Sequence, residues 1–356
     1  MITPAHLLFI TIFLTALMLV LLVIISFTLL IKNKGTKEKN IWLPKVNLLI
    51  TKAIFFEAED ESAQLIPIPP RIKKLLTNQR FRQLLIDELV ISSKNLAGVA
   101  SENLLKLYSQ LELYKDSEKN LNHFSWYKKV KAIQELSAMK LVGFSNTLYE
   151  LTNHKNEFIR MEAQTSIVKF HGFEGLSFLN EIRYPISEWH QIHLLKELSA
   201  VSSSDFKGIE AWLKSPNDSV IIFALKLSAS YHQFHVYDQI IGCLTHFNPK
   251  VRLQAINCLK EIYEDTTALH LMKIYINEAK THQLAILSAL REIASHQSTS
   301  FLQKQLNSGD NQIKLAAARA LLNCGEEGLK IIDKHPGASQ YPLNEIFKQI
   351  KMESKK

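Results

Sequence analysis

An apolar helical pattern recurs about every 31 residues along most of the chain. In NPKVRLQAINCLKEI (residues 248–262), Val251 is followed by apolar residues at +4, +8 and +11, the spacing of one buried helical face. The same pattern can be anchored at seven positions that are 31, 31, 30, 31, 31 and 31 residues apart: Lys128, Ile159, His190, Val220, Val251, His282 and Ile313. A fixed period of this length is typical of repeat proteins.

A second helix precedes the anchored one in each unit. Eleven residues before six of the anchors lie apolar residues at one constant offset: Leu148, Leu179, Ile209, Ile240, Leu271 and Leu302. Short polar breaks, such as residues 153–156 and 248–249, separate the two helices and supply caps for the second one. Each unit is therefore a helical hairpin, and about seven stacked hairpins predict an all-α solenoid.

The units KNEFIRMEA, NDSVIIFALKL, NPKVRLQAINCLKEI and DNQIKLAAARALLNC resemble HEAT repeats, specifically the short HEAT-like kind found in phycobilisome lyase proteins. A Val-Arg pair marks the second helix of that family. It is intact at Val251-Arg252, similar at Ile159-Arg160 and Ile313-Lys314, and lost at His190, Val220 and His282. The resemblance covers about residues 125–325 and implies a right-handed α-solenoid. It carries no lyase activity over, because nothing else in the sequence suggests chromophore chemistry.

Residues 7–31 form a run of 25 residues without a charge. A helix of that length measures about 37 Å, enough to cross a hydrocarbon core of roughly 30 Å with some tilt. The short segment 1–6 carries no basic n-region, and no A-x-A-like site follows the run. A transmembrane anchor is therefore favoured over a cleaved signal peptide.

Four lysines follow the apolar run directly: Lys32, Lys34, Lys37 and Lys39. The positive-inside rule then predicts a single-pass protein whose solenoid is in the cytoplasm, and the family resemblance implies a bacterial inner membrane. The lysines are expected to meet anionic lipid headgroups. Three cysteines, none in a CxxC pair, agree with a reducing compartment. The inverted topology is the alternative that stays open.

The other segments are assigned by composition. Residues 32–70 are expected to form a basic juxtamembrane segment and an irregular stem, with Trp42 at the membrane interface as the alternative. Residues 71–124 hold two helical patterns outside the 31-residue register, which are expected to cap the repeat array of residues 125–335. Residues 336–356 are expected to form a closing helix and a frayed tail.

The sequence contains no nucleotide-binding, zinc-protease or serine-hydrolase motif. Two histidine pairs, His190 with His193 and His232 with His235, are each spaced to lie near one helical face. Neither pair has an acidic or cysteine third ligand in its own helix. The prediction is a protein without a cofactor, metal or catalytic site, and a metal-dependent enzyme is the weaker alternative.

In HEAT-like solenoids the second helices line the concave surface, which is the expected binding face. Offsets +3, +6 and +10 from each anchor are mostly polar and are predicted to face solvent, whereas the apolar offset +2 is predicted to pack between units. Trp189 is interpreted as a packing aromatic, and Phe223 as an exposed aromatic anchor. The candidate partner-binding residues are Lys131, Lys169, His193, Lys196, Phe223, Lys226, Asn257 and Arg319.

Together these features predict a non-catalytic, membrane-anchored scaffold that binds a protein partner on the second helices. Anchored HEAT-like proteins of the bacterial envelope are similar, and that resemblance implies an accessory role in a membrane envelope-polysaccharide system. The formal net charge of +8 makes a basic groove for nucleic acid the alternative. Much of that charge, however, lies in the lysines beside the membrane span.

Overall fold

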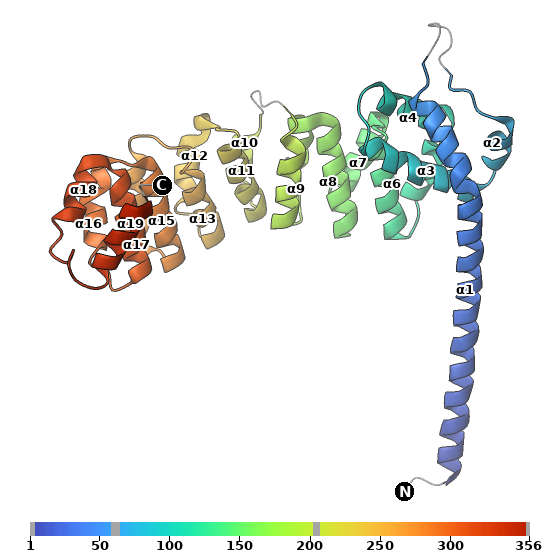
Figure 1. Cartoon of the computed structure of the whole chain (residues 1–356), viewed down its shortest axis with the longest axis horizontal. Helices are drawn as coiled ribbons and strands as arrows, with labels where there is room; N and C mark the ends of the chain where they lie inside the picture. Colours follow the sequence, from blue (N-terminus) through green and yellow to red (C-terminus); the bar gives the residue numbers. More distant parts are fainter. Residues whose placement is uncertain (1–3, 58–64, 202–206, 354–356) are drawn as a thin grey trace. The chain divides into compact units, whose positions relative to one another are not determined.

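The computed structural model describes residues 4–57, 65–201 and 207–353, and within these ranges it contains helices and no strand (Figure 1). The chain divides into unit 1, Met1–Asn146, and unit 2, Thr147–Lys356. The predicted all-α class and the solenoid of helical hairpins are confirmed. The handedness of the solenoid stays a prediction.

The first helix, α1 (Pro4–Ile54), is 51 residues long, or about 76 Å at 1.5 Å per residue. Its apolar half has a mean hydropathy of 2.9 over an 18-residue window, and none of that window is buried in the protein. Among the described residues, α1 is the one helix long and apolar enough to cross a membrane.

The second half of α1 is a core helix of unit 1. Val46, Leu49, Ile50 and Ala53 are buried at the spacing of one helical face. They pack against α2 (Pro70–Leu75), α3 (Gln79–Lys94) and α4 (Val99–Gln110). The irregular stem predicted for residues 32–70 is therefore wrong up to residue 54, because this apolar face keeps the chain helical. Residues 58–64, which follow, lie outside the described part of the chain.

Trp42 also belongs to this core and not to a free stem. Its ring meets Phe81 of α3 edge to face, with 5.7 Å between the ring centroids. Of the four lysines after the apolar run, Lys34, Lys37 and Lys39 are exposed, and the side chain of Lys32 lies outside the described residues.

The first repeat hairpin, α5 (Tyr114–Leu121) with α6 (Trp126–Ala138), completes unit 1. At the offset where six units have Leu or Ile, this hairpin has Ser117, which is fully buried. Its hydroxyl donates to Glu135 Oε2 at 2.5 Å and lies 3.0 Å from the Tyr108 hydroxyl. Gln83 of α3 donates to the other oxygen of Glu135. A buried hydrogen-bonded network thus replaces the apolar contact.

Unit 2 holds six more repeats and a terminal hairpin. The hairpins are α7 (Ser145–Leu151) with α8 (Glu157–His171), η2 (Gly172–Asn180) with α9 (Glu188–Leu198), α10 (Ile209–Trp212) with α11 (Asp218–Ser230), η3 (Phe234–Val236) and α12 (Tyr237–Cys243) with α13 (Pro249–Cys258), α14 (Thr267–Ile274) with α15 (Lys280–Ile293), α16 (Thr299–Gln305) with α17 (Asn311–Asn323), and α18 (Gly325–Asp333) with α19 (Leu343–Glu353). In the last of these, α18 packs on α16 and α19 on α17.

The apolar stripes read from the sequence form one continuous core in unit 2. All six anchors in this unit are buried, and so are the apolar residues eleven positions before them. Each histidine anchor makes a hydrogen bond through Nε2: His282 Nε2 lies 2.8 Å from the carbonyl oxygen of Pro249, and His190 Nε2 lies 2.9 Å from Gln164 Oε1. The buried Nδ1 of His190 has no hydrogen-bond partner among the described residues.

The predicted packing role of offset +2 is only partly right. Ile222, Leu284 and Leu315 are half-buried against the core, but Ile192 is 61% exposed. Offset +5 is the deeper position, with five buried residues in unit 2: Gln164, Leu225, Ile256, Leu287 and Ala318. The +2 side chains of the second helices therefore stay partly open to solvent.

Candidate partner-binding face

The turn before several of the second helices is held by an asparagine cap, as at Asn156, Asn217 and Asn248, and in some units also by an arginine. Arg252 donates from Nη1 to the carbonyl oxygen of His246 at 2.9 Å, six residues upstream, and Asn248 caps α13. Arg160 makes the same bond to His154 at 2.8 Å. The arginine of the Val-Arg pair thus fixes the path of the chain into the helix.

The same device occurs in unit 1, where the sequence pattern was missed. Arg82 of α3 donates to the carbonyl oxygen of Leu76 at 2.8 Å, and Asn78 caps the helix. The helices α2 and α3 therefore form a HEAT-like turn outside the 31-residue register. The sequence motif that identifies this turn is Asn-x-x-apolar-Arg, where x is any residue. It occurs at residues 78–82, 156–160 and 248–252.

Replacing Arg252 with Met is expected to destabilise the α13 hairpin by about 2 kcal/mol. The change removes two charge-assisted bonds to Glu278, at 2.6 and 3.1 Å, and leaves that buried carboxylate without its cation. The expected loss of stability is smaller than for a fully buried ion pair, because Arg252 is partly exposed to solvent. Hydrogen–deuterium exchange of peptides from α13 and α14 measures the effect.

The matched control is Lys250→Met, in the same turn and exposed. Lys250→Met should change the hydrogen–deuterium exchange of the α13 and α14 peptides little. Equal protection from exchange in the Arg252→Met and Lys250→Met variants would contradict a structural role for the arginine.

A groove of about 810 Å³ lies where α9, α11 and α13 begin. Its walls include Ile186, Gln191, Ile222, Phe247 and Lys250. Its volume is in the range of ligand and peptide sites. Three hairpin turns of unit 2 therefore frame one open, mixed apolar and polar depression.

Helix α9 lines this groove with Glu188 and Gln191, and another side of the same helix faces solvent. Trp189, Ile192, His193 and Lys196 are spaced at i, i+3, i+4 and i+7, which places them on one helical face. Trp189 is 65% exposed and stacks on His193, with ring centroids 5.5 Å apart. The interpretation of Trp189 as a packing aromatic is wrong, because offset −1 turns away from the neighbouring helices.

The neighbouring helix α8 continues this surface. Phe158 is 56% exposed, Met161 is half-buried, and Lys169 is exposed at the far end of the helix. Glu197 of α9 links the two helices, since its Oε1 lies 3.7 Å from both Lys169 Nζ and His193 Nε2. We call Phe158, Met161, Trp189, Ile192, His193 and Lys196 the α8–α9 face.

Phe223 does not belong to any exposed surface. Its side chain is 0% exposed, in the core of unit 2, so the predicted aromatic anchor is wrong. The reason is that α11 is apolar on almost every side: Val220, Ile221, Ala224 and Leu225 are buried with it. A helix that is hydrophobic all round is buried.

Other predicted residues are bonded within the protein. Lys226 Nζ donates to Gln191 at 2.9 Å, and burial lowers its pKa. Arg319 pairs with Glu353 of α19 through two hydrogen bonds, and this pairing lowers the pKa of Glu353 to about 2. Lys131 lies in unit 1, where its Nζ is 2.8 Å from Asp87. Asn257 is half-buried on α13.

The two histidine pairs differ from their predicted arrangement. His190 is buried and its ring lies 6.5 Å from that of His193, so the two do not converge. Helix α11 ends at Ser230, before the second pair; His232 has a left-handed backbone, and His235 instead meets Glu210 at 3.2 Å. The described residues contain no group of three His, Cys, Asp or Glu side chains able to hold a metal.

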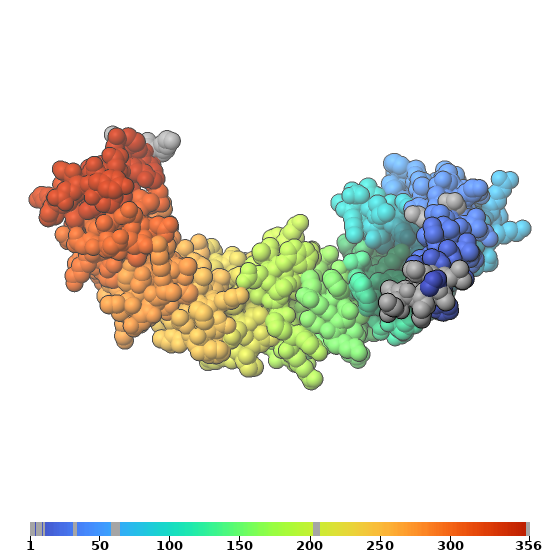
Figure 2. Space-filling view, turned by 90° about the horizontal axis from the view of Figure 1, so that it is seen from below, coloured from blue at the N-terminus to red at the C-terminus, as the bar shows by residue number. Residues whose placement is uncertain are grey.

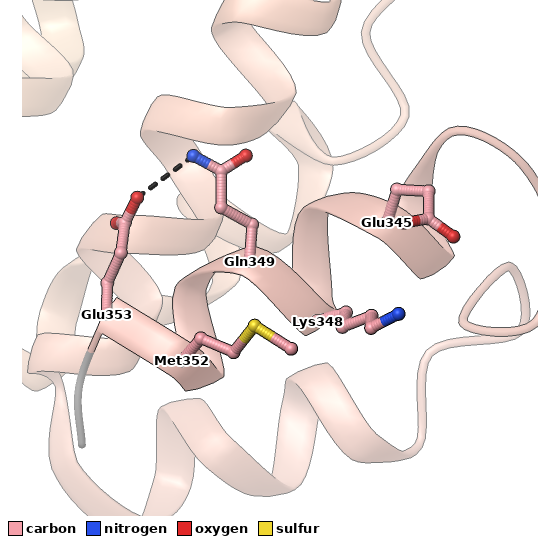
Figure 3. A pocket seen from close by; sticks show the side chains of 5 residues that line it. All are labelled: Glu345, Lys348, Gln349, Met352 and Glu353. Atoms are coloured by element: carbon pink, nitrogen blue, oxygen red, sulfur yellow. Dashed lines mark hydrogen bonds between the residues drawn. The ribbon is translucent and has the colours of Figure 1, made fainter.

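A shallow depression on α19 is formed by a single helix. Figure 3 shows its lining side chains, Glu345, Lys348, Gln349, Met352 and Glu353, with the hydrogen bond from Gln349 to Glu353. Because the groups come from one helix and do not converge, we assign this depression no binding role.

Comparison with known proteins agrees with the hairpin architecture. Residues 237–322 match the family model of HEAT repeats, so the chain carries HEAT repeats. No curated protein matches the sequence. Among solved structures, an engineered protein is similar over 87% of this chain and 88% of its own, at 14% sequence identity and a TM-score of 0.36.

Proposed function

We propose that this HEAT-repeat protein is a membrane-anchored, non-catalytic scaffold that binds a protein partner on the α8–α9 face. The observation that carries the proposal is the exposure of Trp189 and Ile192 on α9 and of Phe158 on α8, two second helices that pack together. Large exposed apolar side chains rimmed by polar groups are typical of protein-interaction sites. A HEAT solenoid suits this role because its rigid stack presents such side chains in a fixed order.

The anchor in this proposal is the apolar half of α1. It is long enough to span a bilayer, and Lys34, Lys37 and Lys39 follow it as the positive-inside rule requires for a cytoplasmic C-terminal side. The free, buried Cys243, Cys258 and Cys324 are compatible with a reducing compartment. Anchoring raises the effective concentration of the partner near the membrane.

The chemistry of the face indicates the kind of partner. Trp189 and Ile192 supply apolar contact area, and Lys196, which makes no ion pair among the described residues, lies one turn further along the same helix. A partner segment with apolar side chains followed by an acidic residue would satisfy both. From the resemblance to anchored envelope proteins, we infer that such a segment belongs to a membrane polysaccharide system.

A nucleic-acid partner is disfavoured by the pairing of the basic side chains. Lys169 lies near Glu197, and Arg319 is held by Glu353. A phosphate backbone would have to displace these carboxylates. The surface is therefore better suited to a protein.

The experiment is photo-crosslinking in cells from a probe at Ile192. A probe at Leu269 of α14, which is apolar and 51% exposed on a first helix, is the matched control. We expect a discrete protein adduct from Ile192 and none from Leu269. Equal labelling from both positions, or nucleic-acid adducts from Ile192 alone, would contradict the proposal.

A further inference from the structure

A second aromatic surface lies in unit 1, at the turn from α5 into α6. Phe124 is 92% exposed, and Trp126 and Tyr127 follow it as exposed side chains. Lys128 and Lys129 come next and are half-buried. We call these five residues the α6 patch. From Lys119 to Lys131 the chain has four lysines and no acidic residue, so the surface is basic as well as aromatic.

The helix that carries the α6 patch is linked through α3 to the part of α1 that leaves the apolar run. A groove of about 430 Å³ is lined by α1 residues, including Gly35 and Trp42, and by α3 residues, including Asp87. Glu38 and Arg80 join the two helices across it, at 3.2 Å. Lys131, in the second turn of α6, binds Asp87 at 2.8 Å. These ion pairs link α6, through α3, to the part of α1 that contains Glu38.

This position matches the surface of a bilayer crossed by residues 7–31. Gly35 lies four residues beyond the run, or about 6 Å along the helix axis. The headgroup layer of one leaflet is about 5–7 Å thick. In Figure 1 the turn into α6 lies at the end of α6 toward which the apolar part of α1 extends, and Figure 2 views unit 1 from that side.

The side chains of the patch have the chemistry of an interfacial site. Tryptophan and tyrosine concentrate at the membrane–water boundary, where an apolar ring and a polar edge are both satisfied. Lysines at the same level are attracted to anionic headgroups. His123 stacks on Phe124, and its Nε2 lies 3.1 Å from Lys128 Nζ. A histidine ring carries no negative charge, so it does not offset the basic character of the patch. A bilayer explains both the aromatic and the basic side chains.

We propose that the α6 patch rests on the anionic surface of the bilayer, as a second membrane contact of unit 1. The inference depends on the proposed function, because it requires α1 to span that bilayer. Two contacts, the span and the patch, would restrict rotation of unit 1 about the axis of α1. The helical anchor then becomes an orienting device and not only a tether.

The test uses the full chain in lipid nanodiscs, with a fluorescent label on an introduced cysteine. Asn122→Cys places the label in the exposed turn beside Phe124. Glu102→Cys is the control, since its neighbour Asn103 bonds to Phe56, beyond the opposite end of α1. The native cysteines are buried, and burial raises the pKa of Cys243 to about 11 and that of Cys258 to about 12, so they react slowly with maleimides.

A quencher on the lipid headgroup reports contact. We expect strong quenching of the Asn122 label in discs with anionic lipid, weak quenching in zwitterionic discs, and little for the Glu102 label in either. Lys128→Gln with Lys129→Gln should reduce the contact equilibrium about 25-fold, or about fivefold per lysine.

Failures of the two proposals are distinguishable in this experiment. If the chain does not insert into the discs, the proposed membrane span is contradicted, and so is the second contact that depends on it. An inserted chain whose two labels are quenched equally would overturn the patch alone. Equal quenching of the Asn122 label in both lipid mixtures would also overturn it, because the anionic headgroup would then play no part.

Discussion

Replacing Phe223 with Ala is expected to lower the free energy of unfolding of the α11 region by about 3–5 kcal/mol. The ring is fully buried among Val220, Ala224 and Leu227, so the change leaves a cavity in the core shared by neighbouring hairpins. In a solenoid each hairpin is stabilised by its neighbours, and the loss should spread to α13. Hydrogen–deuterium exchange of α11 and α13 peptides, in increasing denaturant, measures the effect.

The matched variant is Trp189→Ala on the exposed face. It removes a larger aromatic ring and should still change the opening free energy by less than about 0.5 kcal/mol, because the ring lies mostly in solvent. Equal destabilisation by the two variants would contradict the division of the second helices into a core side and an open side.

Acid is expected to destabilise the α8–α9 region through His190 by about 3 kcal/mol. Burial, with smaller effects of His193 and Arg160, lowers the pKa of His190 to about 4, against 6.5 in an unfolded chain. Between these values the unfolded chain binds a proton that the folded chain does not, so stability is lost as pH falls from about 6.5 to about 4. Each unit of pKa difference corresponds to 1.36 kcal/mol.

His190→Gln isolates this effect. A glutamine amide can donate to Gln164 Oε1, as the imidazole Nε2 does, but it does not titrate. Opening free energies of α8 and α9 peptides at pH 7 and pH 4 should differ between the variant and the natural chain by about 3 kcal/mol. An unchanged pH dependence in the variant would rule out His190 as the group responsible.

The hairpin architecture could be predicted because burial at a fixed period leaves a direct trace in the sequence. The anchors from Ile159 to Ile313 are buried as expected, including the two histidines, and the positions eleven residues upstream are buried too. The second half of α1, beyond the apolar run, was harder to predict from the sequence. Its core face, from Val46 to Ala53, follows Pro44 and charged residues, which are typical of a linker.

The exposed face was harder to predict than the core. Exposure depends on which side of a helix its neighbours cover, and a single periodic stripe does not contain that information. The periodic stripe predicts an exposed Phe223 although its whole helix is apolar, and a packed Trp189 although its neighbours Glu188 and His193 are polar. Counting apolar residues around the full helix would have corrected the first assignment.

The most direct test of the scaffold proposal combines a probe with a surface variant. A photo-crosslinker at Lys196 is carried by the natural chain, by Trp189→Ser and by Leu269→Ser, with adduct yield normalised to the amount of chain in the membrane. We expect one protein adduct whose yield falls at least tenfold in Trp189→Ser and is unchanged in Leu269→Ser. An adduct of equal yield in all three chains would contradict partner binding on the α8–α9 face.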